Sequence, residues 1–182
     1  NAISALKKSI AFAGGLADGP DTTLDHLLLA EMLVLQNRHA EAMALYDAYL
    51  PSAEGEGFLH EVTAALADRA SCLIKLGRSE EGHQQLERAL KRVDEATPSD
   101  IRAIVHSNLA AALKAEGRKD EAGQHHRLAG MAWQTYAHEQ REARRLLAAA
   151  PSLPDQLLLG LLYGCGLKVG EARALRWRDV DI

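Results

Sequence analysis

Aromatic residues are scarce in this sequence, at 4% of its 182 residues, and its apolar side chains are mainly alanine and leucine. Because β-sheets favour branched and aromatic side chains, whereas helices favour alanine and leucine, this composition predicts an all-α protein. Long hydrophobic runs are also missing. The longest uncharged apolar stretch, residues 157–167, is too short to cross a bilayer, so we expect no membrane-spanning segment.

Cysteine and positive charge are limited as well. The two cysteines, Cys72 and Cys165, lie far apart, which argues against a disulfide framework and favours a reducing compartment. The formal net charge of −4 provides no overall basic field, so any DNA binding would need a local patch. The chain begins without Met and shows no signal-peptide pattern. We expect a cytoplasmic protein that is a piece of a longer one.

What the sequence does contain is a repeat with a period of 40 residues. Residues 64–89 hold small and apolar side chains that recur 40 positions before and after, namely Ala30/Ala70/Ala110, Leu33/Leu73/Leu113, Asn37/Gly77/Gly117 and Ala42/Gly82/Ala122. A fixed period of this kind is typical of stacked helix pairs. The expected helices cover about 1–16, 23–36, 39–50, 58–76, 79–93, 100–116 and 119 onward. Pro51 is expected to end the third helix, and Gly117 to end the sixth in a conformation with φ > 0.

The ends of these helices carry residues that are suited to capping. Side-chain oxygens in the position before a helix can accept a hydrogen bond from its free N–H groups. The expected caps are Asp21 or Thr22, Ser79, and Ser99 or Asp100.

These repeated positions resemble the tetratricopeptide repeat (TPR) family, although the usual period of that family is 34. The resemblance implies a right-handed α-solenoid of antiparallel helix pairs over residues 1–138, comprising half a repeat and three full pairs. Small residues would then lie where the two helices of a pair cross. The first helix of each pair would line a concave groove for a partner.

Mapped by position, the resemblance implies that the groove binds a peptide or an amphipathic helix. The expected groove residues are Leu24, Leu27, Glu31, Val34, Leu35, Ala64, Ala67, Ser71, Ile74, Lys75, Ile104, Ser107, Asn108, Ala111 and Lys114. An alternative is that Leu24, Leu27 and Val34 belong to the core. A basic clamp for a C-terminal carboxylate does not match, because only Asn108 fits such a site.

Other polar residues receive structural interpretations. Arg38, Arg78 and Arg118 recur at 40 and are expected to be solvated turn residues, with a basic, ligand-binding column along the turns as the alternative. His125 and His126 point about 100° apart on a helix, so we expect no metal site; His126 is predicted to be in the core and His125 in solvent. Cys72 is expected to be buried. No catalytic residues and no cofactor are predicted.

The tail, residues 139–182, resembles the start of the catalytic domain of tyrosine recombinases, the phage-integrase family. The resemblance rests on Glu142, Leu146, Leu147, 157–163 and the motif Gly166-Leu167-Lys168, followed by Glu171, Leu175, Trp177, Asp179 and Asp181. It implies contact with DNA, here through Lys168, Arg173, Arg176 and Arg178. The family's arginine is replaced by Lys168, and no His-x-x-Arg segment or nucleophilic tyrosine follows. Recombination by this chain is therefore not expected.

The sequence thus predicts a non-enzymatic module that binds a protein or peptide partner, and it is compatible with a homo-oligomer. The alternative is a protein that is related to DNA binding or recombination and contacts DNA through the tail only. The tail itself has three interpretations that stay open: a truncated or fused recombinase, a helical cap on the last repeat over residues 157–167, or a segment with residual DNA affinity.

Overall fold

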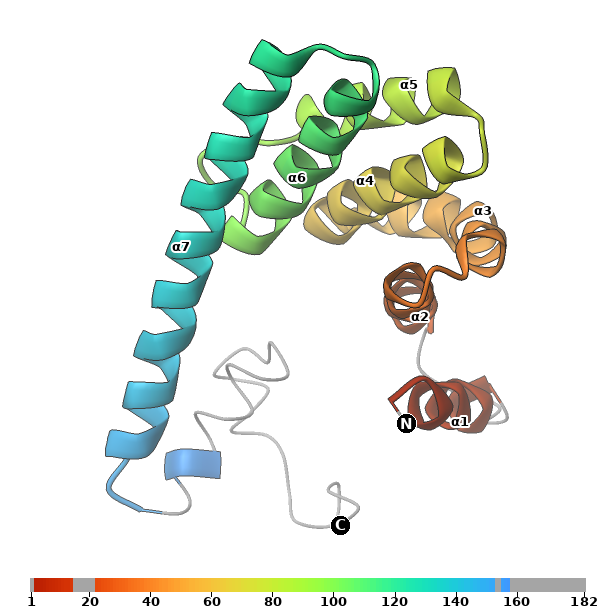
Figure 1. Cartoon of the computed structure of the whole chain (residues 1–182). Helices are drawn as coiled ribbons and strands as arrows, with labels where there is room; N and C mark the ends of the chain where they lie inside the picture. The colour runs from red at the N-terminus through yellow and green to blue at the C-terminus, as the bar shows by residue number, and fades with distance from the viewer. Residues whose placement is uncertain (1, 15–21, 153–154, 158–182) are drawn as a thin grey trace. The chain divides into compact units, whose positions relative to one another are not determined.

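The structure is a computed structural model that describes residues 2–14, 22–152 and 155–157. Within these ranges all regular secondary structure is helical, which confirms the predicted all-α class (Figure 1). The helices are α1 (Ala2–Gly14), α2 (Thr23–Leu35), α3 (His39–Glu56), α4 (Leu59–Lys75), α5 (Ser79–Leu90), α6 (Ser99–Ala115) and α7 (Lys119–Ala149). None of these described helices is both long enough and apolar enough to cross a bilayer.

The chain divides into two compact units, Asn1–Trp133 and Gln134–Ile182. The first unit contains α1 to α6 and the beginning of α7. The boundary that the sequence suggests, between residues 138 and 139, falls inside α7.

Three turns in the first unit have the same geometry at 40-residue intervals. Asn37, Gly77 and Gly117 follow α2, α4 and α6, and their φ angles are 60°, 83° and 80°. In each turn the next residue, an arginine, donates its N–H to a leucine carbonyl five residues earlier, at 2.9, 2.8 and 3.0 Å. This left-handed turn satisfies carbonyl groups at the helix end and reverses the chain. The predicted conformation of Gly117 is confirmed, and the period is a property of the backbone.

Packing in the first unit follows the order of the chain. Each helix from α2 to α6 contacts the next, and α4 also contacts both α2 and α6 (Figure 1). The core contains Leu33, Leu73 and Leu113 together with the fully buried Leu66 and Leu86. The first members of successive pairs are therefore direct neighbours.

Small residues lie where the helices of a pair cross, as the repeat pattern predicts. Ala30, Ala42 and Ala70 are all fully buried. Gly82 of α5 lies so close to α4 that a Cβ atom there would be 2.9 Å from the Ala70 carbonyl oxygen and 2.5 Å from Ile74 Cγ1. A side chain at this position would require the two helices to separate.

The third helix is longer than predicted. We expected Pro51 to end it, but α3 continues to Glu56. Proline lacks the N–H that would donate to the Asp47 carbonyl, so the extension depends on packing. Leu50 and Ala53, on either side of Pro51, are both buried. The helix ends at Gly57, whose φ of 82° lies in the left-handed region that glycine adopts without steric cost.

None of the residues at the capping positions of α2, α5 and α6 makes a side-chain capping hydrogen bond, although Asp100, one of the predicted caps, accepts a hydrogen bond from the Ile101 N–H at 2.9 Å. Ser79 and Ser99 are the first helical residues of α5 and α6, so Arg78 and Pro98 occupy the capping positions. Thr22 precedes α2 as predicted, but its side chain makes no capping hydrogen bond. Asp21 lies outside the described residues.

Candidate functional site

A hollow of about 390 Å³ lies across the N-terminal parts of α2, α4 and α6. Leu24, Ala64 and Ile104, which are equivalent positions at the 40-residue interval, all line it. The remaining lining residues are Asp25, Leu27, Leu28, Glu31, Glu61, Ala65, Asp68, Asp100 and Ile101. We call this hollow the acidic groove, for the carboxylates described below.

The floor of the acidic groove is apolar and belongs to the core. Leu27, Ala65 and Ile101 are buried, with 9% of their surface or less exposed. Leu28 is different, because 47% of its surface is exposed although it is a large apolar side chain. Leu24 and Ile104 are half-buried. An apolar strip therefore faces solvent along the groove.

Five carboxylates also line the groove, and no Lys, Arg or His is among the lining residues that the structure describes. They are Asp25 and Glu31 of α2, Glu61 and Asp68 of α4, and Asp100 of α6. None of the five forms an ion pair within the described part of the chain. The groove is thus an apolar surface with a negative rim.

Burial and mutual repulsion raise the pKa values of two of these carboxyl groups. Burial, and then the charge of Glu31, raise the pKa of Asp68 to about 7, although a hydrogen bond from Asn108 opposes the shift. Burial, and then the charge of Asp100, raise the pKa of Glu31 above its ordinary value. Negative charge on one first helix therefore disfavours ionisation of an acidic group on another, as with Asp100 acting on Glu31 and Glu31 acting on Asp68.

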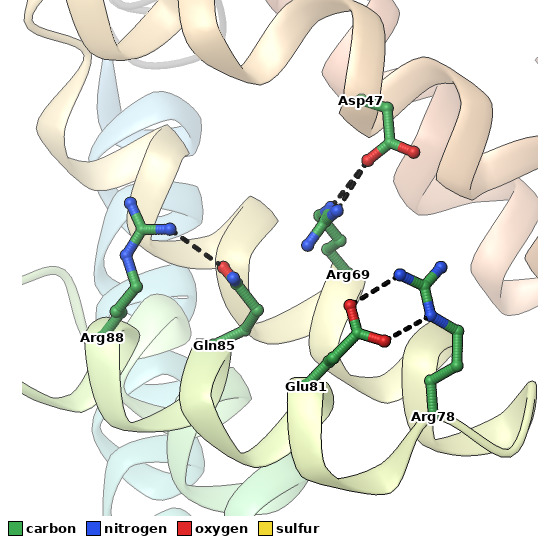
Figure 2. A network of polar contacts seen from close by, with 6 residues as sticks. All are labelled: Asp47, Arg69, Arg78, Glu81, Gln85 and Arg88. Carbon is green, nitrogen blue, oxygen red and sulfur yellow. Dashed lines mark hydrogen bonds and ion pairs between the residues drawn. The ribbon is translucent and has the colours of Figure 1, made fainter.

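Carboxylates on the opposite, turn-bearing edge are neutralised instead. Arg38, Arg78 and Arg118 each pair with the glutamate three residues later, at 2.6 Å in all three turns. Figure 2 shows the Arg78–Glu81 pair, with two hydrogen bonds, beside the Arg69–Asp47 pair at 2.7 Å that joins α4 to α3. The repeated arginines are exposed turn residues with an internal partner, so they form no free basic column.

A second hollow, of about 620 Å³, lies between α6 and α7. It is lined by Ser107, Ala110, Ala111, Lys114, Lys119, Ala122, Gly123 and His126. Lys114 and His126 occupy the positions of Ile74 and Leu86 in the preceding pair, where apolar side chains fill the space. The hollow therefore arises because polar residues replace core residues in the last pair.

The structure brings only some of the predicted groove residues together. Leu24, Leu27, Glu31, Ala64 and Ile104 line the acidic groove. Ser107, Ala111 and Lys114 line the second hollow. The exposed Leu35 and Lys75 and the half-buried Val34, Ser71 and Ile74 line neither hollow.

Three of the predicted groove residues have structural roles, and for one of them, Leu27, the sequence had offered this role as an alternative. Leu27 and Ala67 are 6% and 0% exposed, so they belong to the core, which was the alternative for Leu27. Asn108 donates hydrogen bonds to the Ala67 carbonyl at 3.1 Å and to Asp68 at 3.2 Å. Its amide therefore links α6 to α4, and these two donors already have partners.

The prediction that His126 is in the core and His125 in solvent was wrong. His126 is exposed beside the second hollow, whereas His125 is half-buried and its Nδ1 lies 3.0 Å from Nδ1 of His106. The His106 and His125 rings stack with centroids 5.2 Å apart. A histidine at a core position is not buried here because the neighbouring Lys114 leaves the space open.

Metal ligation and thiol chemistry find little support among the described residues. No three carboxylate, imidazole or thiol groups lie close enough together in that part of the chain to hold a metal ion. Cys72 is fully buried, as predicted, and burial raises the pKa of its thiol to about 11. A thiol with a raised pKa is a poor nucleophile.

No match to known proteins was found. No family model, no curated protein and no solved structure matches this chain. The residues expected to contact DNA, Lys168, Arg173, Arg176 and Arg178, lie outside the described residues, as does the recombinase-like motif around them. Of the tail residues quoted for that resemblance, Glu142, Leu146 and Leu147 lie in α7.

The acidic rim is the part of the site that sequence reasoning missed. Asp25, Glu61, Asp68 and Asp100 were not among the predicted groove residues. A usable signal existed, because Glu61 and Asp68 lie one helical turn on either side of Ala64. Placing Leu24, Ala64 and Ile104 at the centre of the groove would have identified Glu61 and Asp68 as neighbours of that centre.

Proposed function

We propose that this chain is a non-enzymatic interaction module that binds an α-helical segment of a protein partner in the acidic groove. The observation that carries the proposal is the apolar strip formed by the exposed Leu28 and the half-buried Leu24 and Ile104, which α2 and α6 contribute to the lining of one hollow. An amphipathic helix buries its apolar face in a surface of this type.

The proposal includes a right-handed TPR-like solenoid for the repeat region. Two findings support it: the three identical turns at 40-residue spacing, and the direct contact of α4 with both α2 and α6. Stacked pairs whose first helices are neighbours form a continuous inner face. The non-enzymatic character and the cytoplasmic location remain predictions from the sequence.

A pair of matched substitutions tests the groove. Leu28→Asp places a charge on the apolar strip, and because Leu28 is 47% exposed the fold should persist. Leu59→Asp is the control, since Leu59 is similarly exposed, at 50%, but lies outside the groove. Substitution of the buried Leu27 is unsuitable, because a charge there would unfold the core.

The ligands for this test are three labelled helical peptides with leucines at i, i+3, i+4 and i+7 and with Lys, Gln or Glu at the polar positions. We expect the full chain to bind at least one of them in fluorescence anisotropy. Binding should be lost in the Leu28→Asp variant and kept in the Leu59→Asp variant. If no peptide binds, or if both variants bind equally well, the groove is not the binding surface.

A further inference from the structure

We infer that the partner segment of the acidic groove is cationic, an amphipathic helix with lysine or arginine flanking its apolar face. The inference rests on the proposed function, because it names the chemistry of the segment that the same groove binds. It commits to a basic helix of a protein, rather than a neutral or an acidic one.

The distribution of charge in the groove carries the inference. Among the described residues, its lining combines an apolar strip with five carboxylates from three helices and no basic side chain. Elsewhere in the described chain, carboxylates close to arginine are paired, as Glu41, Glu81 and Glu121 show. The groove acids, in contrast, form no ion pair with any other residue that the structure describes.

Repulsion between the groove carboxylates raises the free energy of the empty groove and so favours binding of a cationic ligand. The charge of Asp100 in α6 disfavours ionisation of Glu31 in α2, and the charge of Glu31 disfavours ionisation of Asp68 in α4. A positive charge placed between these helices removes that repulsion and adds attraction in a partly desolvated site. Complementary charge of this kind also accelerates association and selects between partners.

The spacing of the carboxylates favours several separate cations over a single ion. Asp25 and Glu31 are six residues apart, which corresponds to roughly 9 Å along α2. No three groups in the described chain can share one metal ion. A helix that carries lysines on both sides of a leucine face meets the apolar strip and the separated acids together.

The three peptides described above, with Lys, Gln or Glu at otherwise identical positions, test the inference in 50 mM and 500 mM salt. At 50 mM we expect the Lys peptide to bind at least tenfold more tightly than the Glu peptide. The preference should shrink at 500 mM, where the screening length falls to a few ångströms. Spermidine, which carries charge without an apolar face, should compete only weakly.

Matched neutralisations locate the charge effect. Asp25→Asn with Glu61→Gln removes two charges from the groove, whereas Glu87→Gln with Glu95→Gln removes two charges from exposed positions outside it. We expect the groove pair to weaken binding of the Lys peptide roughly 2- to 30-fold, as expected for two partly exposed ion pairs. The control pair should leave the affinity nearly unchanged.

The outcomes separate the inference from the function on which it depends. Preferential binding of the Gln or Glu peptide, lost in Leu28→Asp, would overturn the cationic partner and leave the groove function intact. Competition by spermidine at the affinity of the Lys peptide would show that charge alone is recognised, which also overturns the inference. Failure of all three peptides to bind would reject both proposals.

Discussion

At the crossing of α4 and α5, alanine in place of Gly82 is expected to destabilise the protein. The new Cβ would lie 2.9 Å from the Ala70 carbonyl oxygen, which is backbone, and 2.5 Å from Ile74 Cγ1. Neither atom is the free end of a flexible side chain. Ile74 also packs against the core, so the two helices themselves would have to move apart.

Two opposing effects set the size of the change. Alanine inside a helix is favoured over glycine by about 0.5–1 kcal/mol, which stabilises the variant. Overpacking a tight contact costs about 1–3 kcal/mol. We expect the second effect to exceed the first, so that the free energy of unfolding of Gly82→Ala falls by about 1–2 kcal/mol.

Gly130→Ala is the matched control, because Gly130 lies inside α7 and a Cβ there meets nothing within 4 Å. It should increase stability by about 0.5–1 kcal/mol. Urea unfolding followed by far-ultraviolet circular dichroism measures both variants, and an unchanged m-value shows that the unfolding reaction is the same. Adding Ile74→Ala to Gly82→Ala should recover part of the loss in a double-mutant cycle. Equal stabilisation by the two Gly→Ala substitutions would refute the close crossing.

Four further substitutions test the turns, the core and the groove. Asn37→Gly should stabilise the protein by a few tenths of a kcal/mol and Gly77→Ala should destabilise it by about 1 kcal/mol, because both positions have φ > 0. Urea unfolding measures both changes in unfolding free energy, and changes of the opposite sign would contradict the prediction. Tyr46→Phe should leave the stability unchanged or raise it by about 1 kcal/mol, because the buried Tyr46 hydroxyl has no hydrogen-bond partner among the described residues. A marked fall in the melting temperature of this variant would contradict the prediction and indicate that a bound water satisfies the hydroxyl. The pKa of Asp68 is about 7 in the folded state, above its unfolded value, so the folded state binds the proton more tightly and stability falls as pH rises from about 4 to 7. Asp68→Asn removes this term, and its unfolding free energy should therefore fall less between pH 5 and pH 8 than that of the wild type; parallel curves would contradict the raised pKa.

Much of the fold could be predicted from the sequence because its signals are local and repeated. Glycine or asparagine at 37, 77 and 117 fixes where each pair turns, and small residues at 30, 42, 70 and 82 fix where the helices cross. Three copies of a weak pattern reinforce one another. The end of α3 was predicted wrongly, because burial of Leu50 and Ala53 outweighs the local effect of Pro51.

The binding surface was harder to predict, because it depends on which turn of each helix faces the neighbouring pair. Of the mapped residues, Leu24, Glu31 and Ile104 line one hollow, whereas Ala67 is buried in the core. The carboxylates define an acidic binding surface only as a group, because they come together from three helices. No single helix shows that convergence, so Asp68 and Asp100 appear unremarkable in the sequence.

The most direct measurement is methyl NMR of the full chain, labelled at its leucine and isoleucine methyl groups, during titration with the Lys peptide. Leu24, Leu28 and Ile104 line the acidic groove, whereas Leu59 and Leu76 are exposed elsewhere. We predict that the signals of the first three residues shift together with one binding curve and that those of the last two do not. Shifts confined to Leu59 and Leu76, or a saturating titration that leaves Leu28 unchanged, would contradict binding in the groove.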